Sequence, residues 1–249
     1  MKISGLWIIC LLATTPIGAR ARCSDPNLSA AVPEFQTVQS SRINALLRFG
    51  ETHNLCLGVE YVNVELLTEP VQIRVPGGTV EQAIRLILGH DQQYSVEAHE
   101  RVIEISRITS EPHAKNIFDY VLPDFESRRA SVQELSNLLS MQLVVDLKAP
   151  EVTGFAGNYP AGDLSNEVGP FREHNRTLRS LLTAILSQTK GGAWISGIGW
   201  KLRGDFTIPE KRRIWTFVEY GVPSTGYAGI LENIAAGLEA EKKSTPTTH

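Results

Sequence analysis

The sequence predicts a mixed α+β fold made of two small two-layer βαββαββ domains in tandem, each with two helices packed on one face of a small sheet. Two observations predict this fold. One amphipathic helix pattern occurs at residues 79–88 and again at 177–186. Around each copy, another apolar helix lies upstream and two runs of alternating apolar and polar residues lie downstream.

The first helix of each repeat follows a short apolar strand, faint at residues 35–38 and clear at 118–122. Apolar residues at helical spacing predict this helix. They are Ile43, Leu46 and Leu47 in the first repeat, and Val132, Leu135, Leu138 and Leu139 in the second. Ser131 and Glu134 form a capping box at its second copy. An extended apolar run is expected after each copy, at residues 55–61 and 143–147.

The second helix of each repeat carries the strongest pattern. Its apolar residues recur at i, i+3, i+4, i+7 and i+8, the spacing of a helix with one buried stripe. They are Val80, Ala83, Ile84, Ile87 and Leu88 in one copy, and Leu178, Leu181, Leu182, Ile185 and Leu186 in the other. Thr79 and Thr177 stand at the N-cap positions, and Gln82 completes a capping box with Thr79.

A strand pair follows each second helix, and its apolar and polar residues alternate. The predicted strands cover residues 94–96 and 102–105 in the first repeat, and 193–201 and 214–218 in the second. The polar stretch 109–115 contains a proline and is the expected linker. The stretch 149–166 is rich in glycine and proline, and we expect it to be an extra loop.

The two domains are therefore expected at residues 33–108 and 116–221, followed by a short helix and a disordered tail over 222–249. Within the last segment, four residues have the spacing of a short amphipathic helix: Ile230, Leu231, Ile234 and Leu238. Such a helix would dock either on its own domain or on a partner.

Residues 1–21 have the pattern of a cleavable signal peptide. Lys2 precedes the apolar run 6–13, and Ala19-Arg20-Ala21 has the small-x-small pattern of a cleavage site. The run is shorter than the roughly 20 residues that a membrane-spanning helix needs, although an uncleaved anchor is the alternative. We therefore expect a soluble mature chain with no transmembrane segment, periplasmic or secreted after cleavage near Ala21.

The net charge bears on nucleic-acid binding, and the cysteine content bears on disulfide formation. The formal charge is −3, and it becomes −5 when the two cations of the signal peptide are removed. This acidic balance does not favour nucleic-acid binding, which is typical of basic surfaces. Removal of Cys10 with the signal leaves Cys23 and Cys56 in an oxidising compartment. They form a disulfide there, or Cys56 is a buried thiol and Cys23 a loose one.

No catalytic, metal or cofactor motif stands out. The sequence has no nucleophile elbow, P-loop or dinucleotide fingerprint, and its closest approach to a metal pair is His53 with Cys56. Asp119, Asp124 and Glu126 cluster near one proline, either as a solvated strand end or as an acid–base pair. We therefore predict no catalytic residue, no metal ligand and no cofactor.

Three tryptophans fall on the last predicted hairpin: Trp194, Trp200 and Trp215. Aromatic residues at such positions often hold a hairpin together through cross-strand contacts. Tryptophan is also enriched at interaction hot spots, so these three residues are the candidate partner-binding surface.

The residues that carry a family resemblance are 43–55, 71–88, 94–97 and 102–106 in the first repeat, and more loosely 175–186 and Trp194 in the second. In an exported chain, this order of elements resembles the secretin and TonB short N-terminal domain. That module lies in the periplasm, at the front of outer-membrane secretins and of TonB-dependent signalling receptors. In the family a pore or a plugged barrel normally follows it, and a chain of 249 residues has no room for one. The resemblance thus implies a stand-alone periplasmic interaction module.

We therefore expect a non-enzymatic adaptor or signalling partner in a bacterial cell envelope. The resemblance implies an envelope protein as its partner: a secretin, a TonB-dependent receptor or an anti-sigma regulator. Recognition would use an open sheet edge or a helix face. Two alternatives are an exported enzyme with a dispersed active site, and a structural subunit of a secretion or pilus assembly.

Overall fold

A computed structural model of the chain describes residues 23–60, 70–89, 94–108, 115–147, 167–196, 201–203, 206–208 and 215–220. The predicted signal peptide, the extra loop at 149–166, the last segment 222–249 and Trp200 all lie outside the described residues. The described part has the predicted mixed α+β composition. The first half of the molecule denotes the described residues up to 108, and the second half denotes the described residues from 115 onward.

Four α-helices occur in the described part of the chain: α1 (Arg42–Thr52), α3 (Val80–Leu88), α4 (Val132–Leu147) and α5 (Leu178–Ser187). The predicted starts of α3, α4 and α5 are confirmed. Thr79 caps α3 by accepting a hydrogen bond from the Gln82 amide, and the Gln82 side chain accepts one from the Thr79 amide in return. Ser131 and Glu134 form the same reciprocal box at α4. None of these helices is both long and apolar enough to cross a bilayer.

The strands of the first half are β1 (Ala31–Val32), β2 (Phe35–Ser40), β3 (Cys56–Val59), β4 (Val71–Val75), β5 (Gly78–Thr79), β6 (Tyr94–His99) and β7 (Val102–Arg107). Those of the second half are β8 (Lys115–Asn116), β9 (Val121–Ser127), β10 (Ala130–Ser131), β11 (Glu167–Val168), β12 (Phe171–Thr177), β13 (Gly192–Ser196), β14 (Lys201–Arg203), β15 (Phe206–Ile208) and β16 (Trp215–Glu219). A single 3₁₀ turn among these residues, η1 (Ile117–Asp119), precedes β9.

Two local predictions are wrong in the second half. The run 143–147, predicted to be extended, is the last part of α4, because Leu143 continues the buried stripe of Leu135 and Leu139 at i+4 spacing. The strand predicted at 118–122 begins only at Val121, since η1 occupies the preceding residues. The adjacent valines at 144 and 145 favoured a strand by local propensity, and helical packing outweighed that preference.

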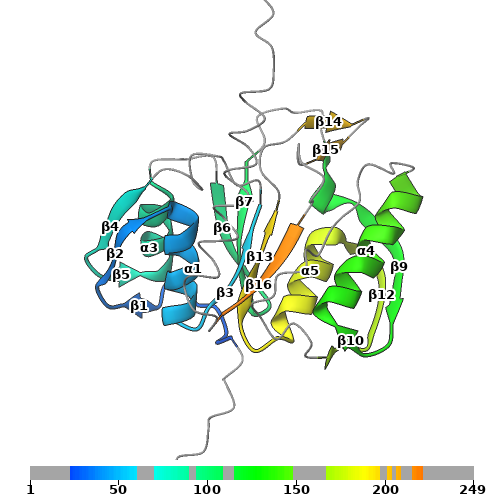
Figure 1. The fold of residues 1–249 in the computed structure, drawn as a ribbon, viewed down its shortest axis with the longest axis horizontal. Coiled ribbons are helices and arrows are strands. Elements are labelled where there is room, and N and C mark those ends of the chain that lie inside the picture. Colours follow the sequence, from blue (N-terminus) through cyan, green and yellow to red (C-terminus); the bar gives the residue numbers. More distant parts are fainter. Residues whose placement is uncertain are drawn as a thin grey trace, which may run out of the picture.

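A central five-stranded sheet contains strands from both halves, in the order β16-β13-β3-β7-β6. The halves meet where β13 pairs with β3 in parallel, with Trp194 opposite Gly58. Helices α1 and α3 cover one face of this sheet, and α4 and α5 cover the other (Figure 1). Outside each helix pair lies a two-stranded sheet, β2–β4 or β9–β12. The sequence predicted a separate small sheet for each repeat, and the pairing of β13 with β3 corrects that prediction.

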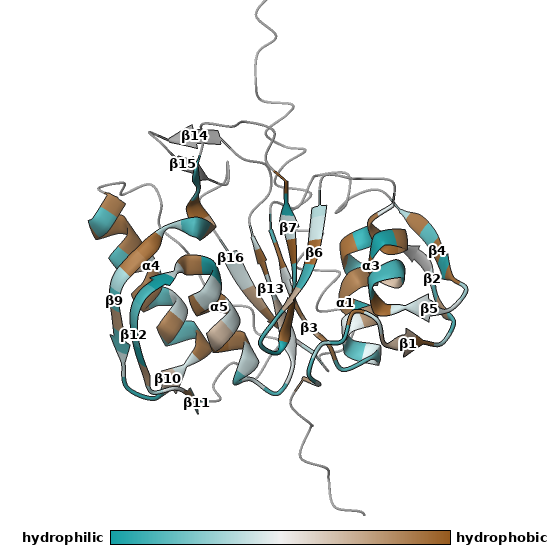
Figure 2. Ribbon diagram, turned by 180° about the vertical axis from the view of Figure 1, so that it is seen from behind, coloured by the Kyte–Doolittle hydropathy of each residue, from teal (hydrophilic) through white to brown (hydrophobic). Residues whose placement is uncertain are grey.

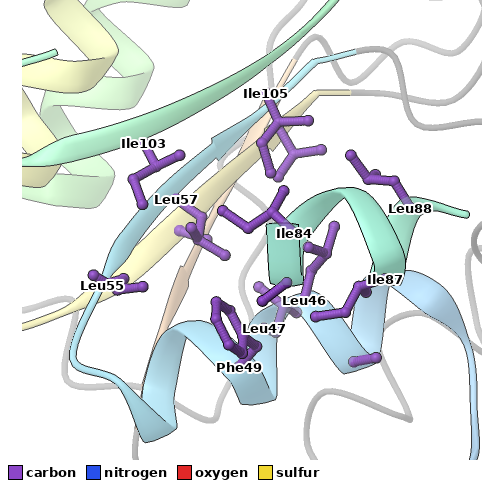
Figure 3. Packing of buried hydrophobic residues seen from close by; sticks show 14 of the residues in the cluster. Leu46, Leu47, Phe49, Leu55, Leu57, Ile84, Ile87, Leu88, Ile103 and Ile105 are labelled. Carbon is purple, nitrogen blue, oxygen red and sulfur yellow. The ribbon is translucent and has the colours of Figure 1, made fainter. Parts of the chain in front are cut away.

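Side chains of the central strands alternate between two hydrophobic cores. Leu57 and Val59 of β3 belong to the first-half core, and so do Ile103 and Ile105 of β7. These side chains meet those of α1 and α3 (Figure 3). Cys56, like Val102 of β7, belongs to the second-half core instead. Because both faces of the sheet are covered, the inner strands β13 and β3 are mainly apolar. Strand β7 contains Glu104, and the edge strand β6 ends in the exposed residues Glu97 and His99, so the central strands in Figure 2 carry both brown and teal segments.

Candidate functional site

Two carboxylates lie on the face of the central sheet that α5 covers. Glu60 directly follows β3 and is fully buried, and Glu104 lies within β7 with 5% of its surface exposed. The Glu60 amide donates to the carbonyl oxygen of Ile105 at 2.9 Å, which continues the β3–β7 ladder. Since side chains alternate along a strand, both carboxylates face the second half of the molecule.

Helix α5 supplies the partners of these carboxylates. Arg179 and Thr183 lie four residues apart on α5, so they share one helix face. Arg179 Nε donates to Glu60 Oε1 and lies 4.0 Å from Glu104 Oε2. The Thr183 hydroxyl donates to Glu104 Oε1. A fourth charge, Asp119 of η1, lies 2.9 Å from Arg179 Nη1 at the solvent side.

Asn116 of β8 completes the arrangement. Its Nδ2 donates to Glu60 Oε2 at 3.0 Å, and its Oδ1 accepts a bond from the Phe118 amide at 2.9 Å. Both oxygens of Glu60 therefore have donors, as a buried carboxylate requires. We call this set the junction cluster, because carboxylates of the first half are bonded by donors of the second half. Its members are Glu60, Glu104, Asn116, Arg179 and Thr183.

Burial and charge act against each other within the junction cluster. Burial raises the pKa of Glu60, although Arg179 and Asn116 oppose the shift. Burial alone would lower the pKa of Arg179, but the charges of Glu60, Asp119 and Glu104 raise it overall, so the guanidinium stays protonated. A substrate cannot reach Glu60, which has no exposed surface. The cluster therefore joins the two halves.

Sequence reasoning missed the junction cluster, although a signal for it exists. Glu60 ends the apolar run of β3, and Glu104 interrupts the apolar run of β7. A carboxylate inside an apolar strand needs a buried cation or several donors. That signal finds the two acids, but nothing in the sequence places Arg179 against them, because the partners are separated by 119 and 75 positions.

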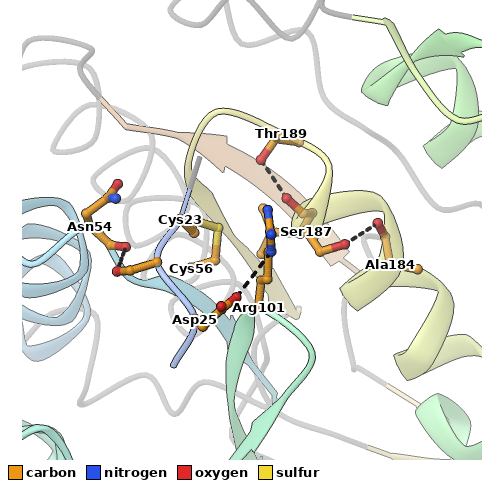
Figure 4. The surroundings of a disulfide bond; sticks show 10 residues. Cys23, Asp25, Asn54, Cys56, Arg101, Ala184, Ser187 and Thr189 are labelled. Carbon is orange, nitrogen blue, oxygen red and sulfur yellow. Dashed lines mark hydrogen bonds and ion pairs between the residues drawn. A yellow bond between two sulfur atoms is a disulfide. The ribbon is translucent and has the colours of Figure 1, made fainter. Parts of the chain in front are cut away.

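A disulfide joins Cys23 to Cys56, with an S–S distance of 2.00 Å and Cα atoms 5.6 Å apart. It fastens the described N-terminal segment to the start of β3 (Figure 4). The Ser24 amide strengthens this attachment by donating to the Asn54 carbonyl oxygen at 2.9 Å. Both cysteines are buried, with 3% and 1% of their surfaces exposed. The bond therefore lies inside the fold, and solvent does not reach its sulfur atoms freely.

An open surface pocket of about 400 Å³ lies beside this disulfide. Its lining comes from the N-terminal segment, the β6–β7 turn and the end of α5: Asp25, Glu100, Arg101, Ser187 and Gln188. The charges that line it are paired, Arg101 with Asp25 and Glu100 with Arg176, each at 3.3 Å. The Ser187 hydroxyl donates to the Ala184 carbonyl oxygen of its own helix at 2.8 Å (Figure 4). The side chains of Asp25, Glu100, Arg101 and Ser187 thus already form ion pairs or hydrogen bonds within the protein.

Two of the candidate partner-binding tryptophans are core residues. Trp194 is fully buried and stacks on Phe118, with ring centroids 5.5 Å apart. Trp215 is 1% exposed, and its indole nitrogen donates to the Ser136 hydroxyl of α4 at 2.8 Å. The interpretation of these two residues as a partner surface is wrong, because the second-half helices cover the sheet face they occupy. The third candidate, Trp200, lies outside the described residues.

The candidate acid–base carboxylates do not converge. Asp119 contacts Arg179, whereas the other two lie in separate cross-strand pairs of β9 and β12. In those pairs Asp124 lies 2.6 Å from His174, and Glu126 lies 3.3 Å from Arg172. The solvated-strand interpretation therefore fits Asp124 and Glu126.

His53 and Cys56, the nearest approach to a metal pair in the sequence, cannot bind a metal ion together, because Cys56 is in the disulfide. The imidazole ring of His53 packs against Phe49, with ring centroids 4.5 Å apart. Burial lowers the pKa of His53, so its neutral form is favoured.

An apolar surface on α4 is the most distinctive exposed feature of the described residues. Leu138, Met141 and Val145 are exposed by 44%, 68% and 72%, and their i, i+3, i+7 spacing places them on one side of the helix. We call these three residues the α4 face. Helix α1 has the corresponding place in the first half, and its exposed residues are polar: Arg48, Glu51 and Thr52. In this respect α4 differs from α1.

Comparisons of this chain with known protein families, with curated proteins and with solved structures find no match.

Proposed function

We propose that this chain is an exported, non-enzymatic protein-interaction module of a bacterial cell envelope, acting in the periplasm or after secretion. Its partner would be an envelope protein of a secretin or TonB-type system: a secretin, a TonB-dependent receptor or an anti-sigma regulator. The domains at 33–108 and 116–221 would be two divergent copies of the short N-terminal domain. The order β2-α1-β3-β4-β5-α3-β6-β7 in the first half, in which β5 has only two residues, supports this proposal.

The α4 face is the observation that carries the proposal. Three neighbouring apolar side chains on one helix, each 44% or more exposed, are typical of a surface that another protein covers. An amphipathic partner helix can align its own apolar residues with this i, i+3, i+7 series. Methionine at the centre of the stripe suits such a surface, because its flexible side chain adapts to different partners.

The β6 edge of the central sheet is less suitable for recognition than the α4 face. Among the described strands, β6 pairs only with β7, so one side of β6 is an edge. That edge carries the exposed side chains of Glu97 and His99, which lie 3.0 Å apart. Charged side chains on an edge strand oppose the addition of a further strand. The helix face is therefore the preferred binding surface.

The non-enzymatic part of the proposal rests on the junction cluster. In this cluster Arg179 is bonded to Glu60 and Asp119, and Glu104 is bonded to Thr183. Catalysis needs such groups to contact a substrate. Glu60, with no exposed surface, is instead suited to holding the two halves together.

Affinity capture with three forms of the full-length mature protein tests this function. Wild type, Met141→Lys and Leu86→Lys would each be immobilised and exposed to the same periplasmic extract. Leu86 is the matched control, because it is also an exposed apolar helix residue (50%) but lies on α3, on the other side of the central sheet. We expect a specific partner to be retained by wild type and by Leu86→Lys, and to be lost with Met141→Lys.

The captured protein would then be purified and titrated against the same three forms by calorimetry. A loss of at least tenfold in affinity for Met141→Lys alone would support the proposal, because such a loss equals about 1.4 kcal/mol. If every captured protein binds all three forms equally, the α4 face is not a partner surface and the proposal fails.

A further inference from the structure

The α4 face has a candidate occupant within this same chain. We propose that residues 230–243 of the chain pack against Leu138, Met141 and Val145 when no partner is bound. This inference rests on the proposed function only in taking the α4 face as a binding surface. It adds that the surface is autoinhibited, so that a partner must displace the chain's own C-terminal segment.

The described chain brings this segment within reach of α4. At the start of β16, Trp215 donates a hydrogen bond to Ser136 on the inner side of α4. The strand then continues to Glu219, and the described residues end at Tyr220, roughly 17 Å further along at the usual strand rise. The following residues 221–229 can span about 30 Å when extended. That length is enough to return to α4 and pass its diameter of about 10 Å.

The sequence of the segment matches the apolar surface. Ile230, Leu231, Ile234 and Leu238 recur at i, i+1, i+4 and i+8, the spacing of one helical stripe. This stripe and the i, i+3, i+7 series of the α4 face have the same helical period. Two such stripes can pack side by side with their side chains interdigitated.

Charge distinguishes this segment from other occupants. Helix α4 contains two acids, Glu134 and Asp146, and no lysine or arginine. The charge of Arg128 acts on Glu134 at the first turn. The C-terminal end of α4 instead combines Asp146 with the negative end of the helix dipole. A complementary segment therefore has a cation beyond its apolar stripe, and Lys242-Lys243 follows Leu238 in this position. The segment also contains Glu232, Glu239 and Glu241, so its net charge is −1 and only its end is cationic.

Two other occupants fit less well. A second copy of the chain would bring two α4 helices together, and neither helix carries a cation to pair with Asp146 of the other. The stretch 149–166, which follows α4 in sequence, contains no lysine or arginine either. Only the C-terminal segment, among these three, supplies both apolar residues at helical spacing and a positive charge.

Attachment to the same chain strengthens such a contact. A tethered segment is present at an effective concentration in the millimolar range when its linker is short and flexible. A contact whose dissociation constant is about tenfold below this concentration would therefore keep the α4 face covered for about nine-tenths of the time. A partner that competes for the face must bind more tightly than this tethered segment.

Photo-crosslinking in the full-length mature protein tests the inference directly. The photoreactive residue p-benzoylphenylalanine would replace Met141, and in a control protein it would replace Leu86. After irradiation of dilute protein, mass spectrometry of the digested monomer would identify the joined peptides. We expect a crosslink from position 141 to residues 230–243, and none from position 86 to that segment. A crosslink from position 141 to residues 149–166, a crosslinked dimer, or no crosslink at all would overturn the inference.

Accessibility of a cysteine provides a second, independent measurement. The native cysteines are joined and buried, so a maleimide reagent would report on Met141→Cys or Leu86→Cys alone. In the structure, Met141 is 68% exposed and Leu86 is 50% exposed, so Met141 would otherwise be labelled at least as fast. Coverage by the segment for nine-tenths of the time would nevertheless slow labelling at position 141 about tenfold. Adding Ile234→Asp should restore the rate at position 141 and leave that at position 86 unchanged; equal rates without Ile234→Asp would contradict the inference.

The two proposals can fail separately. If position 141 labels rapidly and does not crosslink to the C-terminal segment, but Met141→Lys still loses its partner, the partner surface stands and autoinhibition is wrong. If the segment crosslinks and no captured protein distinguishes Met141→Lys from wild type, the segment is a permanent part of the fold and the partner surface is wrong.

Discussion

The guanidinium of Arg179 on α5 donates a hydrogen bond to Glu60, a carboxylate with no exposed surface at the end of β3. This contact joins a helix of the second half to a strand of the first. Removing the cation by Arg179→Met would leave Glu60 buried without its charge partner. We expect a loss of about 3 kcal/mol in the free energy of unfolding, measured by urea denaturation.

Two further variants separate this effect from a general loss of charge. Arg172→Met removes a cation from an exposed pair with Glu126, and such pairs contribute less than about 1 kcal/mol. The double variant Arg179→Met with Glu60→Gln removes both charges, so it should regain part of the lost stability. Equal losses for Arg172→Met and Arg179→Met would contradict a stabilising role for the junction cluster.

The buried position of Glu60 also predicts a pH dependence. Burial raises the pKa of Glu60 above its ordinary value of 4.5, so the folded state holds this proton at pH values where the unfolded state has released it. The contribution of Glu60 to stability is therefore complete below pH 4.5 and is lost as pH rises through the folded-state pKa. Its slope cannot exceed about 1.4 kcal/mol per pH unit, the value for one proton.

Glu60→Gln removes this titration and keeps a hydrogen-bonding side chain of similar shape. The difference in unfolding free energy between variant and wild type should therefore change in favour of the variant as pH rises above 4.5. The measurement is a series of urea titrations from pH 4 to pH 8. A constant difference over this range would show that Glu60 has the same pKa in the folded and unfolded states.

Local signals in the sequence predicted the helices of this protein well. Thr79, Gln82 and Thr177 cap helices where the sequence placed them, because capping depends on residues only three positions apart. Trp194 could not be placed in the same way. Its pattern is that of a half-exposed strand, but Trp194 is buried in the second-half core, on a strand that pairs with β3 of the other half. Such a long-range pairing leaves no periodic trace in either strand.

The candidate sites show the same limit. Leu138 was assigned to the apolar stripe of its helix, but it is 44% exposed, whereas Leu135 and Leu139 are fully buried. An apolar residue beside a buried stripe has the same local pattern whether it faces the core or a binding surface. Similarly, Glu60 is recognisable as an acid in an apolar run, but its partner Arg179 becomes evident only when α5 lies on the central sheet.

The disulfide provides another test of how the N-terminal segment is held. Cys23 and Cys56 are separated by 33 residues, and replacing both with serine removes the crosslink. We expect the double variant to lose about 2–4 kcal/mol of stability, measured by chemical denaturation without reductant. Because the sulfur atoms are buried, dithiothreitol should reduce the bond slowly in the folded protein and rapidly in urea. Equally fast reduction under both conditions would contradict the buried position of the bond.

Close packing between the halves makes Gly58 a sensitive position. A Cβ atom added there would lie 2.5 Å from Cε2 of Trp194, and Trp194 is fully buried and cannot move into solvent. Gly58→Ala should therefore cost about 1–3 kcal/mol in the free energy of unfolding. Trp194→Phe shortens the opposing side chain, so the double variant should be more stable than the sum of the two single changes predicts. Urea denaturation of all four proteins measures this coupling, and strict additivity would show that β3 and β13 are not in contact at this pair.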